Sequence, residues 1–343
     1  MTLELGIDTF GDVTFDDDGA PKPQAQVLRD LVEQGVLADQ VGLDVIGVGE
    51  HHREDFAVSA PDVVLAAIAA KTERIHLASA VTVLSSDDPV RVHQRFATLD
   101  GLSGGRAEVV LGRGSFIESF PLFGYDLARY EDLFEEKLEL FARLLPQEPV
   151  RWEGRLRPSI DGLSVYPRVE GGSLRTWVGV GGNPESVVRA ARYGLPLQVA
   201  IIGGSPAQFV PLVDLYRRAL DQLGKEPQPV AVHSPGHVAP TDEEAKEQLW
   251  PHYEVVMSRI GRERGWGPTN RSQFEAAASR EGSLYVGSPE TVARKIAATV
   301  QRLGIQRFDL KYSNGTLPHS AMMRSLELYG TQVAPMVREL LAR

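Results

Sequence analysis

The sequence contains no cysteine among its 343 residues. This absence excludes disulfide bonds, thiolate-bound zinc, iron–sulfur clusters and a thiol nucleophile. Any redox chemistry must therefore come from a bound organic cofactor, and any metal would need histidine and carboxylate ligands. The sequence also lacks a Walker A motif, a Gly-x-Ser-x-Gly elbow and a Rossmann glycine fingerprint, which disfavours ATP-dependent transfer and serine hydrolysis.

The chain also lacks an excess of positive charge and lacks long apolar runs. The chain has 36 Lys and Arg residues against 46 Asp and Glu, a formal net charge of −10, without a basic run. Nucleic acid and anionic membrane surfaces are therefore unexpected partners. No stretch approaches about 18 consecutive apolar residues, and the first residues lack the pattern of a signal peptide, so we expect a cytoplasmic protein.

Short β-branched apolar runs alternate with longer helical stretches along the whole chain. This alternation is typical of parallel strands joined by helices. Eight strands are predicted, at 3–8, 45–49, 75–83, 107–111, 176–180, 197–202, 230–233 and 307–312. Helices are predicted at 23–41, 61–72, 89–102, 129–145, 184–193, 206–223, 289–303 and 321–341. Eight such units close a (β/α)8 TIM barrel, an α/β fold.

The length of the chain would also fit two domains, but one barrel of about 250 residues plus insertions fits equally well. Because every candidate ligand contact falls at the strand ends of one barrel, we predict a single domain, 1–343. The surplus residues are assigned to two insertions. Residues 146–167 are expected to form a hairpin, with strands at 150–152 and 163–166 around a turn at 159–162. Residues 235–282 are the candidate lid.

Glu50-His51-His52 ends the second predicted strand, at the barrel end where active sites lie. Adjacent histidines on an extended segment point to opposite sides and cannot easily share one ion, so no metal site is predicted. One imidazole could simply be packed and bonded within the loop. The preferred interpretation is that at least one faces the pocket as an acid, a base or a hydrogen-bond donor.

Two glycine-containing turns could bind an anion. Gly112-Arg113-Gly114 ends the fourth strand, and its glycines would let the backbone approach a ligand that the guanidinium grips. Gly181-Gly182-Asn183-Pro184 opens a helix, whose free N–H groups favour a phosphate. The simpler alternatives are a surface arginine in a turn and an asparagine that only caps its helix, as Asp88, Ser205 and Ser288 would cap theirs.

In order and spacing, these motifs resemble the bacterial luciferase-like, flavin-dependent monooxygenase family. The resemblance covers nearly the whole chain and rests on the following blocks: Leu5-Gly6-Ile7-Asp8, Gly49-Glu50-His51-His52, Asp88-Pro89-Val90-Arg91, Leu99-Asp100-Gly101-Leu102-Ser103-Gly104-Gly105-Arg106, Leu111-Gly112-Arg113-Gly114, Gly194-Leu195-Pro196 and Tyr285-Val286-Gly287-Ser288-Pro289-Glu290.

The resemblance implies reduced FMN at the C-terminal mouth of the barrel, or coenzyme F420, a deazaflavin, as the alternative. His51 would be the catalytic histidine, and a non-prolyl cis peptide would lie under the flavin at Ala80-Val81. The implied cofactor contacts are Ala80, Val81, Arg113, Gly114, Ser115, Gly182, Asn183, Ser186, Ala200 and Ile201. The apolar residues Phe10, Phe116 and Phe120 are expected to line a partly hydrophobic substrate pocket.

The function implied by the resemblance is a monooxygenase that uses reduced FMN and O2, through a C4a-peroxyflavin, on a small organic substrate. A separate NAD(P)H-dependent flavin reductase and a homodimer are the implied partners. Luciferases carry a cysteine near the flavin where this chain has Gly112, so light emission is not expected. The alternatives are an F420-dependent dehydrogenase and a non-catalytic flavin-binding protein. Retention of His51, Arg113 and Asn183 argues against the last.

Overall fold

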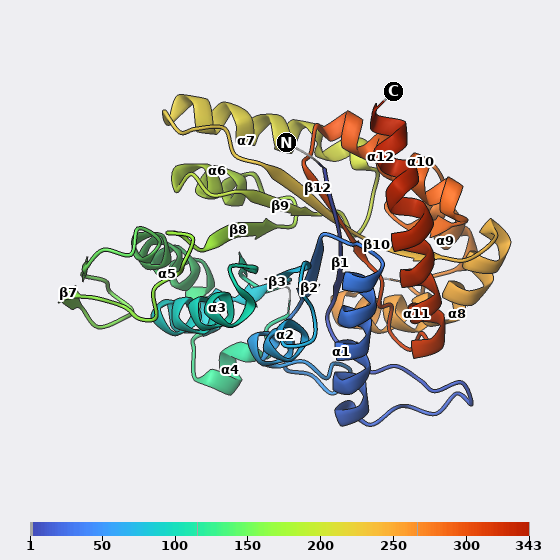
Figure 1. The fold of residues 1–343 in the computed structure, drawn as a ribbon, viewed down its shortest axis with the longest axis horizontal. Helices are drawn as coiled ribbons and strands as arrows, with labels where there is room; N and C mark the ends of the chain where they lie inside the picture. The colour runs from blue at the N-terminus through green and yellow to red at the C-terminus, as the bar shows by residue number, and fades with distance from the viewer. Residues whose placement is uncertain (1–2, 115, 266, 343) are drawn as a thin grey trace.

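The structure, a computed structural model, describes residues 3–114, 116–265 and 267–342. Within these ranges eight parallel strands pair side by side and close into a barrel (Figure 1). In order around the ring they are β1 (Glu4–Thr9), β2 (Val45–Val48), β3 (His76–Ser79), β5 (Ala107–Gly112), β8 (Arg175–Val180), β9 (Leu197–Ala200), β10 (Val230–Val238) and β12 (Arg307–Lys311). The predicted TIM barrel is confirmed.

Helices surround the barrel, as Figure 1 shows. They are α1 (Gln24–Gln40), α2 (Pro61–Ala69), α3 (Pro89–Ser103), α4 (Ser119–Phe123), α5 (Tyr130–Leu144), α6 (Pro184–Arg192), α7 (Val210–Gln222), α8 (Asp242–Arg264), α9 (Arg271–Ala278), α10 (Pro289–Leu303), α11 (His319–Leu328) and α12 (Ala334–Ala342). The predicted C-terminal helix is divided into α11 and α12 by a π-helical turn, Tyr329–Val333. In the described part of the chain, no helix has the length and apolarity needed to cross a bilayer.

Local sequence determines where several helices begin. The side chains of Asp88, Asn183, Ser205 and Ser288 each accept a hydrogen bond from a backbone N–H of the first turn, and each precedes a proline. Proline is tolerated there because its missing N–H would have had no partner within the helix. The apolar faces of these helices pack on the outer faces of the strands and form the main hydrophobic core.

The hairpin between α5 and β8 differs from its prediction in register. Its strands are β6 (Val150–Trp152) and β7 (Ile160–Leu163), and Trp152 pairs with Ile160. The predicted turn at 159–162 and strand at 163–166 were therefore wrong, since the chain reverses before Ile160. Val150 and Trp152 pack against Leu140 and Leu144 of α5, and this apolar contact decides which residues pair.

The strand predicted to end at His233 continues to Val238. Its last residues leave the barrel ring and pair with β11 (Tyr285–Gly287). A β-carbon on Gly236 would lie 2.4 Å from the carbonyl oxygen of Tyr285, so only glycine allows this close pairing. The segment that projects from the barrel therefore begins after Val238 and consists mainly of α8 and α9.

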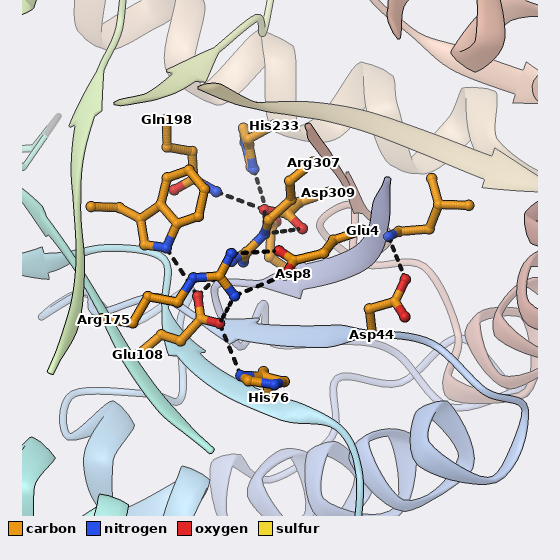
Figure 2. A network of polar contacts seen from close by, with 12 residues as sticks. Glu4, Asp8, Asp44, His76, Glu108, Arg175, Gln198, His233, Arg307 and Asp309 are labelled. Atoms are coloured by element: carbon orange, nitrogen blue, oxygen red, sulfur yellow. Dashed lines mark hydrogen bonds and ion pairs between the residues drawn. The ribbon is translucent and has the colours of Figure 1, made fainter. Parts of the chain in front are cut away.

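The inside of the barrel carries charge near the strand starts (Figure 2). Arg307 donates to Glu108 at 2.7 Å and to Asp309 at 2.8 Å, and Glu108 also accepts from Arg175 and from the indole N–H of Trp177. Burial by itself would raise the pKa of Glu108, but Arg307 and the neighbouring cationic groups lower it to about 2. The ion pairs therefore hold buried charges that would be costly without partners.

His93 on α3 is a buried imidazole with neither nitrogen bonded to a described residue. Burial lowers its pKa, with Arg168 adding to the effect. The unfolded chain therefore binds a proton below about pH 6.5 that the folded chain resists, so His93 makes stability fall as the solution becomes acidic.

We expect His93→Phe to raise the free energy of unfolding at pH 7 by about 1–2 kcal/mol, because it removes two unpaired polar atoms and can pack against Phe141. Urea unfolding between pH 5 and pH 8 should also show a weaker loss of stability at acidic pH. In the control His93→Gln, the free energy of unfolding should fall less at acidic pH than in wild type, but it should not rise at pH 7. An equal stability for His93→Phe and wild type at pH 7 would contradict the argument.

Candidate active site

The carboxyl ends of the strands meet around the Ala80–Val81 peptide, which is cis as expected from the family resemblance. Val81 points into the barrel and packs against two glycines. A β-carbon on Gly112 would lie 2.4 Å from a methyl group of Val81, and one on Gly179 would lie 2.9 Å away. Glycine at both positions therefore makes room for Val81 at the centre of the mouth.

His51 follows β2 and lies among phenylalanine rings. Its imidazole is 4.3 Å from the ring of Phe56, 5.0 Å from Phe116 and 5.1 Å from Phe10, measured between centroids. The side chain is only 10% exposed. Burial lowers the pKa of His51 to about 4, so the imidazole is neutral at pH 7 and offers one hydrogen-bond donor and one acceptor.

The neighbouring His52 has a different environment. Its Nε2 lies 2.9 Å from Glu50 Oε1, while Glu50 Oε2 accepts a hydrogen bond from the backbone N–H of Val83. The Glu50 carboxylate thus links the loop after β2 to the segment after the cis peptide. The two histidines point to different groups, as the extended backbone predicts.

A cavity of about 280 Å³ lies next to His51. It is lined by segments from the loops after β1, β2 and β12, by Phe116 and by α8. The apolar or aromatic lining residues are Val13, Phe15, Pro21, Phe56, Phe116, Val255, Val256 and Ile260. Because Phe56 and Phe116 contact both His51 and the cavity, the imidazole lies behind the innermost wall. Phe116 was a predicted pocket residue and the lining residues of α8 fall within the predicted lid, 235–282, whereas Phe56 was not predicted.

The other two predicted pocket residues lie elsewhere. Phe10 contacts His51 but is not among the described lining residues. Phe120 is fully buried and packs on Tyr130 at 5.5 Å, so it lies outside the described lining of this cavity. The reason is the short helix α4, which turns Phe120 inward and leaves Leu122 and Phe123 exposed.

Ion pairs connect α8 to the loop after β2 at the rim of this cavity. Arg53 bonds to Glu263 at 2.5 Å, and Arg259 lies 2.7 Å from Asp55. The guanidinium of Arg53 also lies 4.4 Å from the ring centroid of Phe116. The segment predicted to be a lid is thus held against the cavity by charged contacts, and its opening and closing stays a prediction.

Arg113 and Gly114 follow β5 beside the start of α5. Arg113 forms an ion pair with Glu131, and its guanidinium lies 5.2 Å from the ring of Tyr130. The Tyr130 hydroxyl donates to the carbonyl oxygen of Gly114 at 2.8 Å. Ser115, also expected at this site, lies outside the described residues.

The turn before α6 is exposed and follows β8, the strand paired with the one that ends before Arg113, and α6 itself carries unused donors. Asn183 accepts from the N–H of Glu185 at 2.8 Å, so it caps α6 as the simpler alternative held. Gly182 has φ +126°, a conformation suited to glycine. The Ser186 hydroxyl and Nη1 of Arg189 are buried without a described partner. Since Arg189 also bonds to Glu131, these donors adjoin the Arg113 pair and fit an anionic group such as a phosphate.

The end of β9 contributes one side chain to the mouth rather than two. Ala200 is half-buried, on the same side of the strand as Gln198, which points into the barrel toward Asp309. Ile201 is fully buried in the core between strands and helices, because successive side chains of a strand point to opposite faces. Any contact from Ile201 to a ligand in the mouth would therefore involve its backbone.

Known proteins share this architecture. The family profile described as luciferase-like monooxygenase matches residues 9–307. The 4-hydroxyprotoasukamycin monooxygenase of Streptomyces nodosus subsp. asukaensis is 27% identical over 326 residues, which cover 91% of this chain and 87% of that protein.

Solved structures with the same fold use different cofactors. The oxygenating constituent of 3,6-diketocamphane monooxygenase from Pseudomonas putida, in complex with FMN, is 20% identical with a TM-score of 0.79 over 98% of this chain and 99% of that one. An F420-dependent secondary alcohol dehydrogenase is 20% identical with a TM-score of 0.73 over 98% and 99%. Since the family profile spans most of the sequence and agrees with the barrel, the chain belongs to the luciferase-like monooxygenase family.

Proposed function

We propose that this protein is an FMN-dependent monooxygenase that uses reduced flavin and O2 on a small, partly hydrophobic organic substrate. The observation that carries the proposal is the juxtaposition, at one barrel mouth, of unused anion-binding donors and an aromatic cavity beside His51. Reduced FMN, when bound, supplies the electrons that activate oxygen. A separate NAD(P)H-dependent reductase would supply the reduced flavin, and a homodimer is the proposed assembly.

The roles of the residues follow from their positions. Arg113, Gly114, Gly182 and Ser186 would hold the phosphate, while Ala80, Val81 and Ala200 would support the ring. Phe56, Phe116 and the apolar residues of α8 would surround the substrate and exclude water, which would protect a reactive intermediate from hydrolysis. His51, neutral and packed behind Phe56 and Phe116, would hold or transfer a proton at a ring nitrogen, which requires these rings to let the reacting atoms reach it.

Arg113→Ala tests the phosphate site. Loss of a charge-assisted contact of about 1.5–3 kcal/mol should weaken FMN binding by about ten- to a hundredfold. Riboflavin, which has no phosphate, should bind wild type and variant alike. Titration of flavin fluorescence measures both dissociation constants. Unchanged FMN affinity in Arg113→Ala would refute the assignment.

Glu131 should weaken binding of the FMN phosphate, because its carboxylate competes with the phosphate for Arg113 and Arg189. We expect Glu131→Gln to tighten FMN binding by about fivefold, the order of one exposed ion pair, and to leave riboflavin binding unchanged. The matched control is Asp132→Gln, which removes a neighbouring charge in the same helix turn and should have a smaller effect. Weaker FMN binding by Glu131→Gln would contradict this role.

The deazaflavin alternative is tested by the cofactor requirement. If the protein is a monooxygenase, reduced FMN and oxygen together should support turnover of an apolar aldehyde or ketone. Turnover of a secondary alcohol with F420, equal with and without oxygen, would favour the dehydrogenase instead.

A further inference from the structure

Asp8 and His233 form a buried pair inside the barrel, below the mouth. Their strands, β1 and β10, are not neighbours, because β12 lies between them. Both side chains therefore point to the barrel axis and meet across the inner face of β12, where His233 Nδ1 bonds to Asp8 Oδ2 (Figure 2). Asp8 is 1% exposed and His233 is 6% exposed. The function proposed above assigns no role to either residue.

His233 reaches the layer of the proposed flavin site. It pairs in register with Ala200, which is the cofactor contact proposed on β9. Its ring stacks on Phe10 at 5.8 Å with an interplanar angle of 20°. The same Phe10 ring meets His51 edge to face at 5.1 Å. His233 and His51 therefore lie on two sides of one phenylalanine, at the end of the barrel where ligands bind.

The other charged groups of the interior already have partners. Asp309, the register neighbour of His233 on β12, bonds to Arg307 and to Gln198. His233 Nε2, in contrast, bonds to no described residue, and neither does the second oxygen of Asp8. His233 Nε2 is thus a polar atom beside the mouth that has no partner among the described residues.

Hydrogen-bond chemistry determines what that atom can do. An ionised carboxylate only accepts, so the bond to Asp8 places the proton on Nδ1 and leaves the lone pair of a neutral ring on Nε2. A carboxylate that orients a histidine in this way is a common arrangement behind functional imidazoles. An acceptor beside a flavin distinguishes its redox states, since the reduced ring carries an N–H that the oxidised ring lacks.

We propose that His233, oriented by Asp8, contacts the flavin ring and accepts a hydrogen bond that favours its reduced form. This inference rests on the proposed flavin-dependent function and adds a residue to it. It assigns Asp8 a positioning role, because the carboxylate acts through the imidazole.

Two substitutions separate this role from a structural one. In His233→Asn the amide N–H can still donate to Asp8, but nothing replaces Nε2. In His233→Gln the longer amide can place its oxygen near the position of Nε2. Dissociation constants for oxidised and for anaerobically reduced FMN, with melting temperatures, are measured for both variants and for wild type.

We expect His233→Asn to weaken binding of reduced FMN by about tenfold, the cost of one hydrogen bond, and of oxidised FMN by less than about twofold. His233→Gln should restore reduced-FMN affinity to within about threefold of wild type. Asp8→Asn should show the same selective loss of affinity for reduced FMN, because an amide, unlike a carboxylate, does not force the imidazole proton onto Nδ1. If His233→Asn does not fold, Asp8→Asn takes its place in the test.

Equal loss of both redox forms, or wild-type affinity of His233→Asn for reduced FMN, would overturn the inference. Its failure is distinguishable from failure of the proposed function. If Arg113→Ala weakens FMN binding while His233→Asn has no effect, only the role of His233 is wrong. If the wild-type chain does not bind FMN, the proposed function itself is wrong.

Discussion

Replacing His51 with alanine is expected to lower substrate-dependent oxygen consumption by about a hundredfold or more, the range observed for loss of a general acid or base. The imidazole packs among Phe10, Phe56 and Phe116, whose rings cannot transfer a proton, and its Nδ1 lies 3.9 Å from Glu118 Oε1. The assay couples a flavin reductase to an apolar aldehyde or ketone and measures oxygen, product and hydrogen peroxide. FMN affinity should change little, because the phosphate contacts lie on β5 and α6.

His52→Ala is the matched control. It removes an adjacent imidazole that bonds to Glu50, so it should lower the melting temperature more than the rate. If both alanine variants reduce turnover equally, the loop rather than His51 itself is responsible. Wild-type turnover in His51→Ala would remove the catalytic assignment.

The pH dependence gives a second check on His51. Because burial lowers its pKa to about 4, the ring stays neutral from pH 7 down to about pH 5. A rate that requires neutral His51 should therefore fall at acidic pH with an apparent pKa near 4, well below the usual 6.5. The same depressed pKa makes His51 contribute to stability above about pH 6.5, and this contribution is lost as the pH falls through 4.

Replacing Arg307 with leucine should lower the free energy of unfolding at pH 7 by about 3–5 kcal/mol. The substitution removes one partner of a buried network and leaves the carboxylates of Glu108 and Asp309 inside the barrel without their main cation. Urea unfolding measures the loss. The control Arg294→Leu breaks an exposed ion pair with Glu290 on α10 and should cost less than about 0.5 kcal/mol.

Acid should reduce the difference between Arg307→Leu and wild type. In wild type the pKa of Glu108 is lowered to about 2, so its ion pairs contribute fully above about pH 4.5 and are lost as the pH falls through 2. Without Arg307 the carboxyl groups can protonate at higher pH and then need no cation. A destabilisation below about 1 kcal/mol at pH 7 would show that the barrel interior does not depend on this arginine.

Structural features that depend on residues close together in the chain could be predicted from the sequence. Apolar runs and helix caps such as Asp88 and Ser288 act through neighbouring residues, so most strands, several helix starts and the closed barrel followed from them. The strand predicted at 75–83 is divided into β3 and a short strand, Thr82–Val83. The family motifs placed the cis peptide at Ala80–Val81 and His51 at a strand end. The errors arose where a distant contact decides the outcome, as in the hairpin, where Trp152 pairs with Ile160 because α5 binds the apolar side.

The candidate site shows the same division. Arg113 and Ser186 were predicted as phosphate contacts because glycine turns at strand ends can be recognised locally, and this assignment stays a prediction. Phe120 lies in the core and not in the wall of the described cavity, because α4 turns it inward, and Ile201 faces the helices by alternation along β9. Val255, Val256 and Ile260 of α8 lie within the predicted lid, but their position in the cavity wall had no local signal, since this segment is about 200 residues from His51 in the sequence.

The sequence by itself determined the barrel and the starts of several helices, and it predicted which strand ends carry chemistry, because hydrophobic period, capping and glycine turns act over a few residues. Only the tertiary structure decided which polar groups meet inside. Arg307 with Glu108, and Asp8 with His233, come from strands that are far apart in the chain, and closure of the barrel brings them together. The charges of Arg307 and Glu108 persist inside the barrel because the fold supplies each of them with a partner there.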